Sequence, residues 1–358
     1  RSAATWRRAF GITAVRLEEE QLQAAQKTDT EMQMPVQEVR PAPAPPAAPA
    51  PRPTMADLIM RGRAAIEASD CPDKMLELLQ ERFDRAFGPT APVRGVEPTR
   101  RVRGACIFVI GHMCDLLGSF DKYHSAVSLF DLYCIREGST VDLQTLPRVC
   151  SMICRLLFKV EHAYLPVHPA TIAAVQAYEN TLLNEFRTAG LVPDDVEVNP
   201  ISELRLLEVL GWAMQPTTVD KWLKGFCERF NSATLGRFQE VIDWIREQGI
   251  TSATMLLPED AMTQLSSKEW AIGTLCYMLA EARMLSPQML LAGIDGRAAG
   301  MAEALQADQG SDLPEPHQAW AFECLLLAIG ATRVDELQQP MLSYFATAVP
   351  IIRTWPQQ

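Results

Sequence analysis

The sequence of 358 residues lacks the features that mark several common classes of protein. No apolar run reaches the roughly 20 residues that a membrane-spanning helix needs, so no membrane span is predicted. There is no glycine-rich phosphate-binding loop, no His-Glu-x-x-His motif and no Gly-x-Ser-x-Gly nucleophile elbow. We therefore predict a non-catalytic protein without a cofactor.

An excess of positive charge is also missing, because 33 basic and 44 acidic residues give a formal net charge of −11 at pH 7. A protein that neutralises phosphates needs the opposite balance, so nucleic-acid binding is not expected. The nine cysteines include no Cys-x-x-Cys pair, and most lie in apolar helical patterns. They indicate buried free thiols in a reducing compartment, the nucleus or the cytoplasm. Cys150 and Cys154 lie one helical turn apart without further ligands nearby, so no metal site is predicted.

The N-terminal part of the chain has the composition of a tail. Residues 1–16 contain four arginines and no acidic residue, which is typical of an organelle-targeting remnant or of an ordinary basic tail. The first alternative would place the protein in an organelle. Residues 41–53 are proline and alanine apart from Arg52, a composition that favours an extended spacer. We predict that residues 1–53 are disordered.

Helical periodicity is the dominant pattern that the sequence does contain. From Arg101 onward, apolar residues recur at helical spacing, and strand alternation is hard to find. Turn residues separate the segments, among them Gly118-Ser119, Asn231-Ser232 and Gly249. The sequence therefore predicts an all-α fold. The expected helices cover residues 101–118, 122–136, 143–163, 169–188, 200–211, 217–230, 234–248, 259–265, 266–284, 286–294, 296–307, 315–330 and 334–349.

Pro216 divides these helices into two sets, since proline cannot continue a helix but is favourable in the first turn of the next one. We expect two consecutive five-helix bundles, at residues 101–214 and 215–310. Residues 54–100 should form N-terminal helices that pack on the first bundle. Residues 311–358 should form a C-terminal helical extension.

Five short segments, taken in order, resemble one known helical module. They are Val102-Arg103-Gly104-Ala105-Cys106, Ala126 to Tyr133, Lys159-Val160-Glu161, Glu203 to Leu210 and Gln215 to Leu223. The ordered set is similar to the cyclin box, the module with which cyclins bind and activate cyclin-dependent kinases. The resemblance covers about residues 101–230, and the rest of the chain shares only the helical pattern. It implies two cyclin-box-like bundles.

The resemblance implies a role for four residues at the kinase contact. Lys159 and Glu203 fall on the two positions that hydrogen-bond backbone groups beside the regulatory helix of the kinase. Leu156 and Phe158 fall on or beneath the same surface. As partner contacts, Lys159 and Glu203 should be exposed on one surface of the first bundle, and their charged groups should have no internal partner.

The resemblance also implies a structural ion pair between Arg103 and Asp131, which join the first and second helices of a cyclin box. In many cyclins the first helix helps to form a hydrophobic dock for Arg-x-Leu motifs. Here Phe108-Val109 replaces the usual Asp-Trp, and His112 replaces a glutamate. Only a degenerate and shallower dock is therefore expected, at Val102, Ala105, Cys106 and Val109.

These expectations lead to two functional hypotheses. The first is a cyclin-like regulatory subunit that binds a cyclin-dependent kinase and stabilises its active conformation. The alternative is a cyclin-fold scaffold subunit of a larger multiprotein assembly, without kinase activation. The long connection from Tyr164 to Ser202 and the extra helices after Ser311 favour the alternative.

Overall fold

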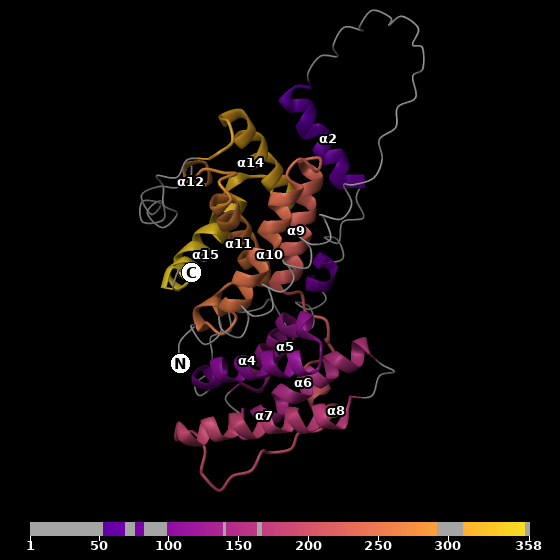
Figure 1. Cartoon of the computed structure of the whole chain (residues 1–358), viewed down its shortest axis with the longest axis vertical. Helices are drawn as coiled ribbons and strands as arrows, with labels where there is room; N and C mark the ends of the chain where they lie inside the picture. The colour runs from indigo at the N-terminus through magenta and orange to yellow at the C-terminus, as the bar shows by residue number, and fades with distance from the viewer. Residues whose placement is uncertain are drawn as a thin grey trace, which may run out of the picture. The chain divides into compact units, whose positions relative to one another are not determined.

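The computed structural model describes residues 53–68, 76–81, 99–138, 141–162, 167–291 and 311–354. Every regular element in these ranges is a helix, so the prediction of an all-α protein is confirmed for them (Figure 1). Residues 55–350 form one compact unit. In the part of the chain that is described, no helix is both long and apolar enough to cross a membrane. The predicted tail and the helix predicted at 296–307 lie outside the described residues, apart from Pro53.

Among the residues that the structure describes, the first bundle contains five α-helices and one short 3-10 helix, η1. They are α4 (Thr99–Leu116), η1 (Phe120–Lys122), α5 (Tyr123–Glu137), α6 (Leu146–Glu161), α7 (Pro169–Thr188) and α8 (Glu203–Val209). Helices α4, α6 and α7 pack against one another, and α5 contacts α4, α6 and α8. The apolar periodicity predicts these helices to within a few residues at each end. Their inward faces supply a core that includes Ile107, Ile110, Met113, Phe130 and Phe186.

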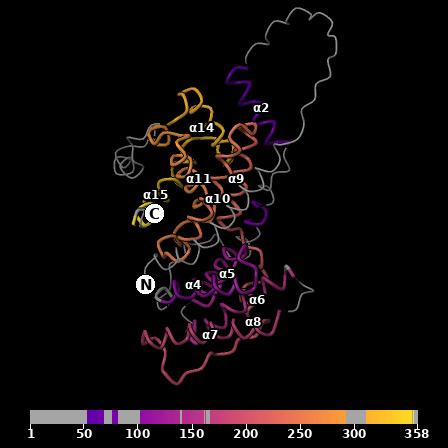
Figure 2. Tube along the Cα trace, in the orientation of Figure 1, coloured from indigo at the N-terminus to yellow at the C-terminus, as the bar shows by residue number. Residues whose placement is uncertain are grey.

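The second bundle is organised around α9. Its elements are α9 (Val219–Ala233), α10 (Gln239–Leu256), η3 (Asp260–Gln264), α11 (Ser267–Glu281), α12 (Pro287–Leu290), α14 (Glu315–Ile329) and α15 (Val334–Thr354). Helix α9 packs against α10, α11 and α14, and Figure 2 shows α9, α10 and α11 side by side. Trp222, Phe226 and Phe230 lie on its buried face, which explains why so many helices gather there.

Helix α10 differs from the sequence prediction at both ends. Leu235 and Gly236 have positive φ values of 54° and 71°, so the chain turns there and α10 begins later than expected. Gly249 was expected to mark a turn, which is wrong, because it lies inside α10. A Cβ atom at Gly249 would lie 2.7 Å from Cδ2 of Leu223. This glycine therefore serves the close packing of α10 on α9.

The N-terminal helix α2 (Met55–Ala68) packs mainly on α9 and α14. Its buried residues are Leu58 and Gly62, and a Cβ atom at Gly62 would overlap the carbonyl oxygen of Ala233 in α9. The helix at 76–81 also reaches the second bundle, since Thr217 donates a hydrogen bond to Gln80. The prediction that residues 54–100 pack on the first bundle is therefore wrong for α2.

Helices α14 and α15 contribute to the core of the second bundle. Trp320 of α14 is fully buried, and α14 packs along α9. Tyr344 and Phe345 of α15 are also buried, and the side chain of Tyr344 lies directly against Gly273 in α11. The residues expected to form a C-terminal extension are therefore part of the packing of this bundle.

Replacing Gly62 with alanine should destabilise the protein by about 1–3 kcal/mol, because the added methyl group must push α2 away from the backbone of α9. Chemical denaturation measures this change, and faster proteolysis within residues 55–68 should accompany it. Gly104→Ala is the matched control, since its nearest atom outside α4, the oxygen of Pro258, would lie 3.9 Å from the new Cβ. That variant should be neutral or slightly stabilised. Equal effects of the two substitutions would contradict the close crossing of α2 and α9.

Candidate functional site

Lys159 and Glu203 meet where α6 ends and α8 begins. Lys159 lies in the last turn of α6 and Glu203 is the first residue of α8, positions at which each charge interacts favourably with its helix dipole. Ser202 caps α8 by accepting a hydrogen bond from the amide of Arg205 at 3.1 Å. Lys159 Nζ lies 2.5 Å from Glu203 Oε1, and the two side chains are 50% and 43% exposed.

The structure therefore brings together the two residues on which the kinase hypothesis depends. Both are accessible on one surface of the first bundle, as a partner contact requires. The expectation that their charged groups have no internal partner is wrong, because they pair with each other at a sequence separation of 44. The start of α8 therefore lies next to the end of α6.

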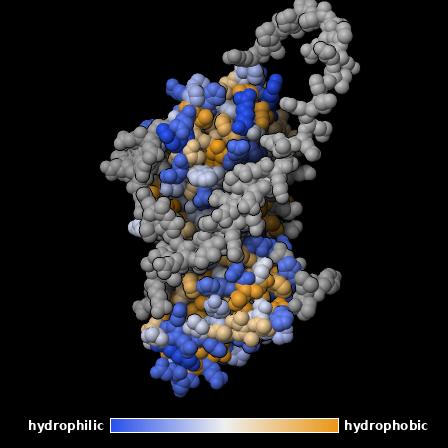
Figure 3. Space-filling view, in the orientation of Figure 1, coloured by the Kyte–Doolittle hydropathy of each residue, from blue (hydrophilic) through white to orange (hydrophobic). Residues whose placement is uncertain are grey.

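Two exposed apolar residues accompany this pair and were not singled out from the sequence. Val160 follows Lys159 and is 55% exposed, and Leu204 follows Glu203 and is 57% exposed. We call Lys159, Val160, Glu203 and Leu204 the pair face. The sequence signal that could have identified them is an apolar residue outside the buried face of each helix. In Figure 3, hydrophobic and hydrophilic residues are intermixed on the visible face of the first bundle.

Leu156 and Phe158 lie below this surface to different extents. Leu156 is buried in the core of the first bundle, and Phe158 is half-buried. The ring of Phe158 lies 4.8 Å from that of His162, centroid to centroid. Leu156 therefore packs in the core under α6, while part of the Phe158 side chain is exposed to solvent.

Arg103 and Asp131 form the ion pair expected between α4 and α5. Arg103 donates from Nε to Oδ1 and from Nη2 to Oδ2 of Asp131, each at 2.8 Å. A third hydrogen bond runs from Nη1 to the carbonyl oxygen of Leu257 at 2.9 Å, in the second bundle. Burial alone would lower the pKa of Arg103, but its neighbours, chiefly the Asp131 carboxylate together with that of Asp260, outweigh this effect, and the pKa is raised. The guanidinium group therefore connects three elements, which the sequence did not indicate.

The expected substrate dock is not present as a surface. Val102, Cys106 and Val109 are buried, and Ala105 is half-buried. Helix α4 is packed against α5, α6 and α7, so these positions contribute to the core. The prediction of a shallow dock at these four residues is therefore wrong.

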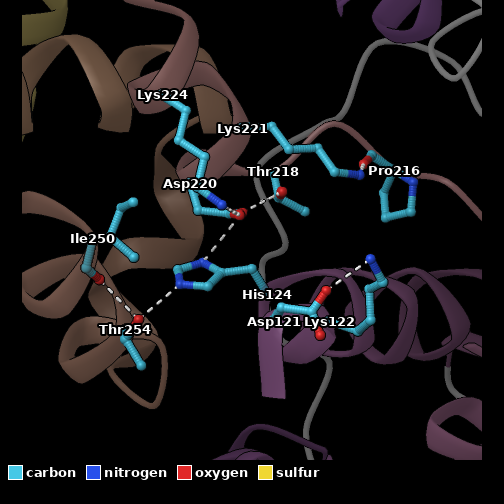
Figure 4. Close-up of polar contacts among 10 residues, drawn as sticks. All are labelled: Asp121, Lys122, His124, Pro216, Thr218, Asp220, Lys221, Lys224, Ile250 and Thr254. Carbon is cyan, nitrogen blue, oxygen red and sulfur yellow. Dashed lines mark hydrogen bonds and ion pairs between the residues drawn. The ribbon is translucent and has the colours of Figure 1, made fainter. Parts of the chain in front are cut away.

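A buried polar contact joins α5 of the first bundle to α9 and α10 of the second (Figure 4). His124 Nε2 lies 2.8 Å from Thr254 Oγ1, and His124 Nδ1 lies 3.9 Å from Asp220 Oδ1. Asp220 accepts a hydrogen bond from Thr218 at 2.5 Å, and Lys224 Nζ lies 3.5 Å from its other oxygen. No sequence pattern indicated this contact, because its members come from three distant segments.

The order Thr254, His124, Asp220 is that of a nucleophile, base and acid triad, but the hydrogen bonds do not support that chemistry. Thr254 Oγ1 donates its only proton to the carbonyl oxygen of Ile250 at 2.8 Å, so it must accept from His124. The separation of 3.9 Å between Asp220 and the ring is too long for a hydrogen bond. The hydroxyl group is therefore not poised for deprotonation by the imidazole.

The cysteines in the described part of the chain are all free and buried, which confirms the prediction of buried thiols for them. Cys114 Sγ and Cys154 Sγ lie 3.7 Å apart in the core of the first bundle. Burial raises the pKa of Cys276 to about 12, so this thiol stays protonated at neutral pH. Among the described residues, no group of three or more potential ligands is arranged to hold a metal ion.

No family model, curated protein or solved structure matches the chain. The geometry of the sites above therefore carries the functional argument, together with the sequence resemblance to the cyclin box.

Proposed function

We propose that the protein is a cyclin-like regulatory subunit that binds a protein kinase of the cyclin-dependent class. In this proposal α4 to α8 are a cyclin box, the second bundle is a second cyclin-like box, and the chain has no catalysis of its own. The supporting observation is the pair face, where Lys159 and Glu203 meet at two helix ends beside the exposed Val160 and Leu204. The buried thiols agree with the nucleus or the cytoplasm as its compartment.

The pair face is suited to bind backbone groups of a partner helix. An exposed ion pair contributes only about 0–1 kcal/mol to stability, so the fold has little need of this one. The ammonium group of Lys159 has three donors, and the carboxylate of Glu203 has several acceptor sites. Their mutual hydrogen bond uses one donor and one acceptor, so the others can bind a partner. The end of a partner helix presents unsatisfied amides or carbonyls. A donor and an acceptor placed side by side can satisfy such groups while Val160 and Leu204 bury apolar surface.

Binding of this kind explains how a subunit without catalytic residues could activate an enzyme. A protein kinase is inactive when its regulatory helix is displaced, because the strand lysine and the helix glutamate then cannot pair at the ATP phosphates. A partner that binds the active position of this helix more tightly shifts the population towards it. A shift from about 1:99 to 99:1 needs roughly 10⁴-fold tighter binding to the active state.

A scaffold subunit of a larger multiprotein assembly, without kinase activation, is the second candidate. The burial of Val102, Cys106 and Val109 favours it, because it removes the surface on which a substrate dock would form. The additional helices favour it as well, since α2 and α14 on α9 and α15 on α11 add surface that a minimal two-box protein would not have.

Replacing both Lys159 and Glu203 with alanine should abolish kinase binding and activation. Truncating charged groups that meet buried backbone should cost at least about 2 kcal/mol of binding, roughly 30-fold in the dissociation constant. Helix content and the thermal midpoint should hardly change, because both side chains are about half exposed. Affinity purification with identification of the bound proteins, followed by a kinase assay, measures the effect.

The double variant Asp243→Ala/Arg246→Ala is a matched control. These residues form an ion pair of 2.6 Å on α10, and their side chains are 43% and 40% exposed. The control should bind the kinase as the parent does. If the Lys159/Glu203 variant still activates a bound kinase, these residues are not the contact. If the parent retains a large assembly without a kinase, the scaffold candidate replaces the first.

A further inference from the structure

The hydrogen bonds around His124 determine which ring nitrogen carries the proton. Thr254 Oγ1 has one hydrogen and donates it to Ile250, so it can only accept from the imidazole. His124 is therefore protonated at Nε2, and in the neutral ring Nδ1 carries a lone pair. Nδ1 is buried and has no hydrogen-bond partner. A proton added at Nδ1 would leave the Nε2 donor to Thr254 in place, but it would put a positive charge into this buried contact between α5, α9 and α10 (Figure 4).

The surroundings of His124 oppose a second proton. Burial lowers the pKa of this imidazole most strongly, Asp220 opposes that effect, and Lys224 adds to it. Both charged groups belong to α9, and α10 contributes only the hydroxyl of Thr254. On the side of η1, Lys122 is paired with Asp121 at 2.8 Å. Asp220 Oδ1 accepts from Thr218 and lies 3.9 Å from Nδ1, while its other oxygen faces Lys224, so a charged ring would have a counter-ion that is too far away for a hydrogen bond.

We propose that His124 is an acid-sensitive latch between the two bundles, whose neutral ring holds α5 against α9 and α10 and whose protonation opens that contact. In the opened contact water reaches the ring, and the imidazolium is then solvated rather than confined. Arg103 also connects the two bundles, since its Nη1 donates to the carbonyl oxygen of Leu257 and lies 4.0 Å from Asp260 Oδ1. The guanidinium group does not titrate in this range, so opening would begin at the His124 side. The latch is independent of kinase binding.

The direction of the pH effect follows from this geometry. The open state titrates near the ordinary histidine pKa of 6.5, and the closed state titrates below it. Above pH 6.5 neither state takes up the proton, and the closed contact is fully stable. As the pH falls below 6.5, only the open state gains a proton, so the ratio of open to closed molecules rises by up to about tenfold per pH unit.

Hydrogen exchange of the full-length protein, compared between parent and His124→Gln at each pH, tests the latch. The glutamine amide can still donate to Thr254 but does not titrate. The ratio of the parent's exchange rate to that of His124→Gln, for amides of residues 123–130, 219–224 and 250–257, should be up to about tenfold higher at pH 5.5 than at pH 7.5. Because intrinsic exchange also depends on pH, each comparison is made at one pH.

His317→Gln is the matched control, since it makes the same substitution at an exposed position of α14 and should retain the pH response of the parent. Equal pH dependence in the parent and His124→Gln would overturn the latch. If the glutamine variant does not fold, an NMR titration of the His124 ring in the parent decides the question. Protonation at or above pH 6.5 with the contact still protected would show that Asp220 accepts the cation, and it would also overturn the proposal.

Discussion

Replacing Arg103 with alanine should lower the free energy of unfolding by about 3–5 kcal/mol, even without any partner protein. The substitution leaves the Asp131 carboxylate, whose side chain is only 16% exposed, without its two hydrogen bonds. It also removes the donor to the carbonyl oxygen of Leu257 in the second bundle. An unpaired carboxylate in this position keeps its desolvation cost and loses the compensating charge. Urea denaturation measures the change directly.

The exposed pair between Arg333 and Asp335 provides the control for Arg103→Ala. Its atoms are 2.5 Å apart, but the side chains are 70% and 60% exposed. Arg333→Ala should therefore change stability by less than about 1 kcal/mol. If the two alanine variants are equally stable, the Arg103–Asp131 pair does not stabilise the fold in the way its geometry indicates.

Replacing Trp320 with alanine should also destabilise the protein by about 3–5 kcal/mol. Trp320 is fully buried on α14, its ring lies 5.8 Å from that of Phe238, and the Arg237 guanidinium lies 5.3 Å from its centroid. Removing the indole leaves a cavity at the contact of α14 with the second bundle. Because residues 55–350 form one compact unit, the loss should appear in the main unfolding transition.

Trp244→Ala removes the same side chain from a position on α10 that is 42% exposed. It should cost much less, since about half of that indole already contacts water. Guanidinium denaturation of both variants gives the comparison. If Trp320→Ala produces a separate early transition and leaves the main one unchanged, α14 and α15 are an independent extension, as the sequence first indicated.

The features that could be predicted from the sequence are those that depend on local pattern. Apolar residues at helical spacing bury one face of each helix wherever that helix docks, so the all-α class and most helix positions followed from periodicity alone. The same reasoning placed Cys114, Cys154 and Cys276 in the core. The Arg103–Asp131 pair could be predicted because the resemblance to the cyclin box implied which residues of two neighbouring helices face each other. Gly249 was misread because a turn and a close helix crossing both favour glycine.

Other features depend on which helices meet, and local pattern carries no information on that. Helix α2 lies on α9 because Gly62 fits against Ala233, a contact between residues far apart in the chain. Val102 and Cys106 proved to be core residues only once α5, α6 and α7 covered α4. His124 meets Asp220 and Thr254 only after three segments converge. The sequence by itself determined the helices and their apolar faces, and the tertiary structure decided their neighbours, because packing between distant segments depends on shape complementarity in three dimensions.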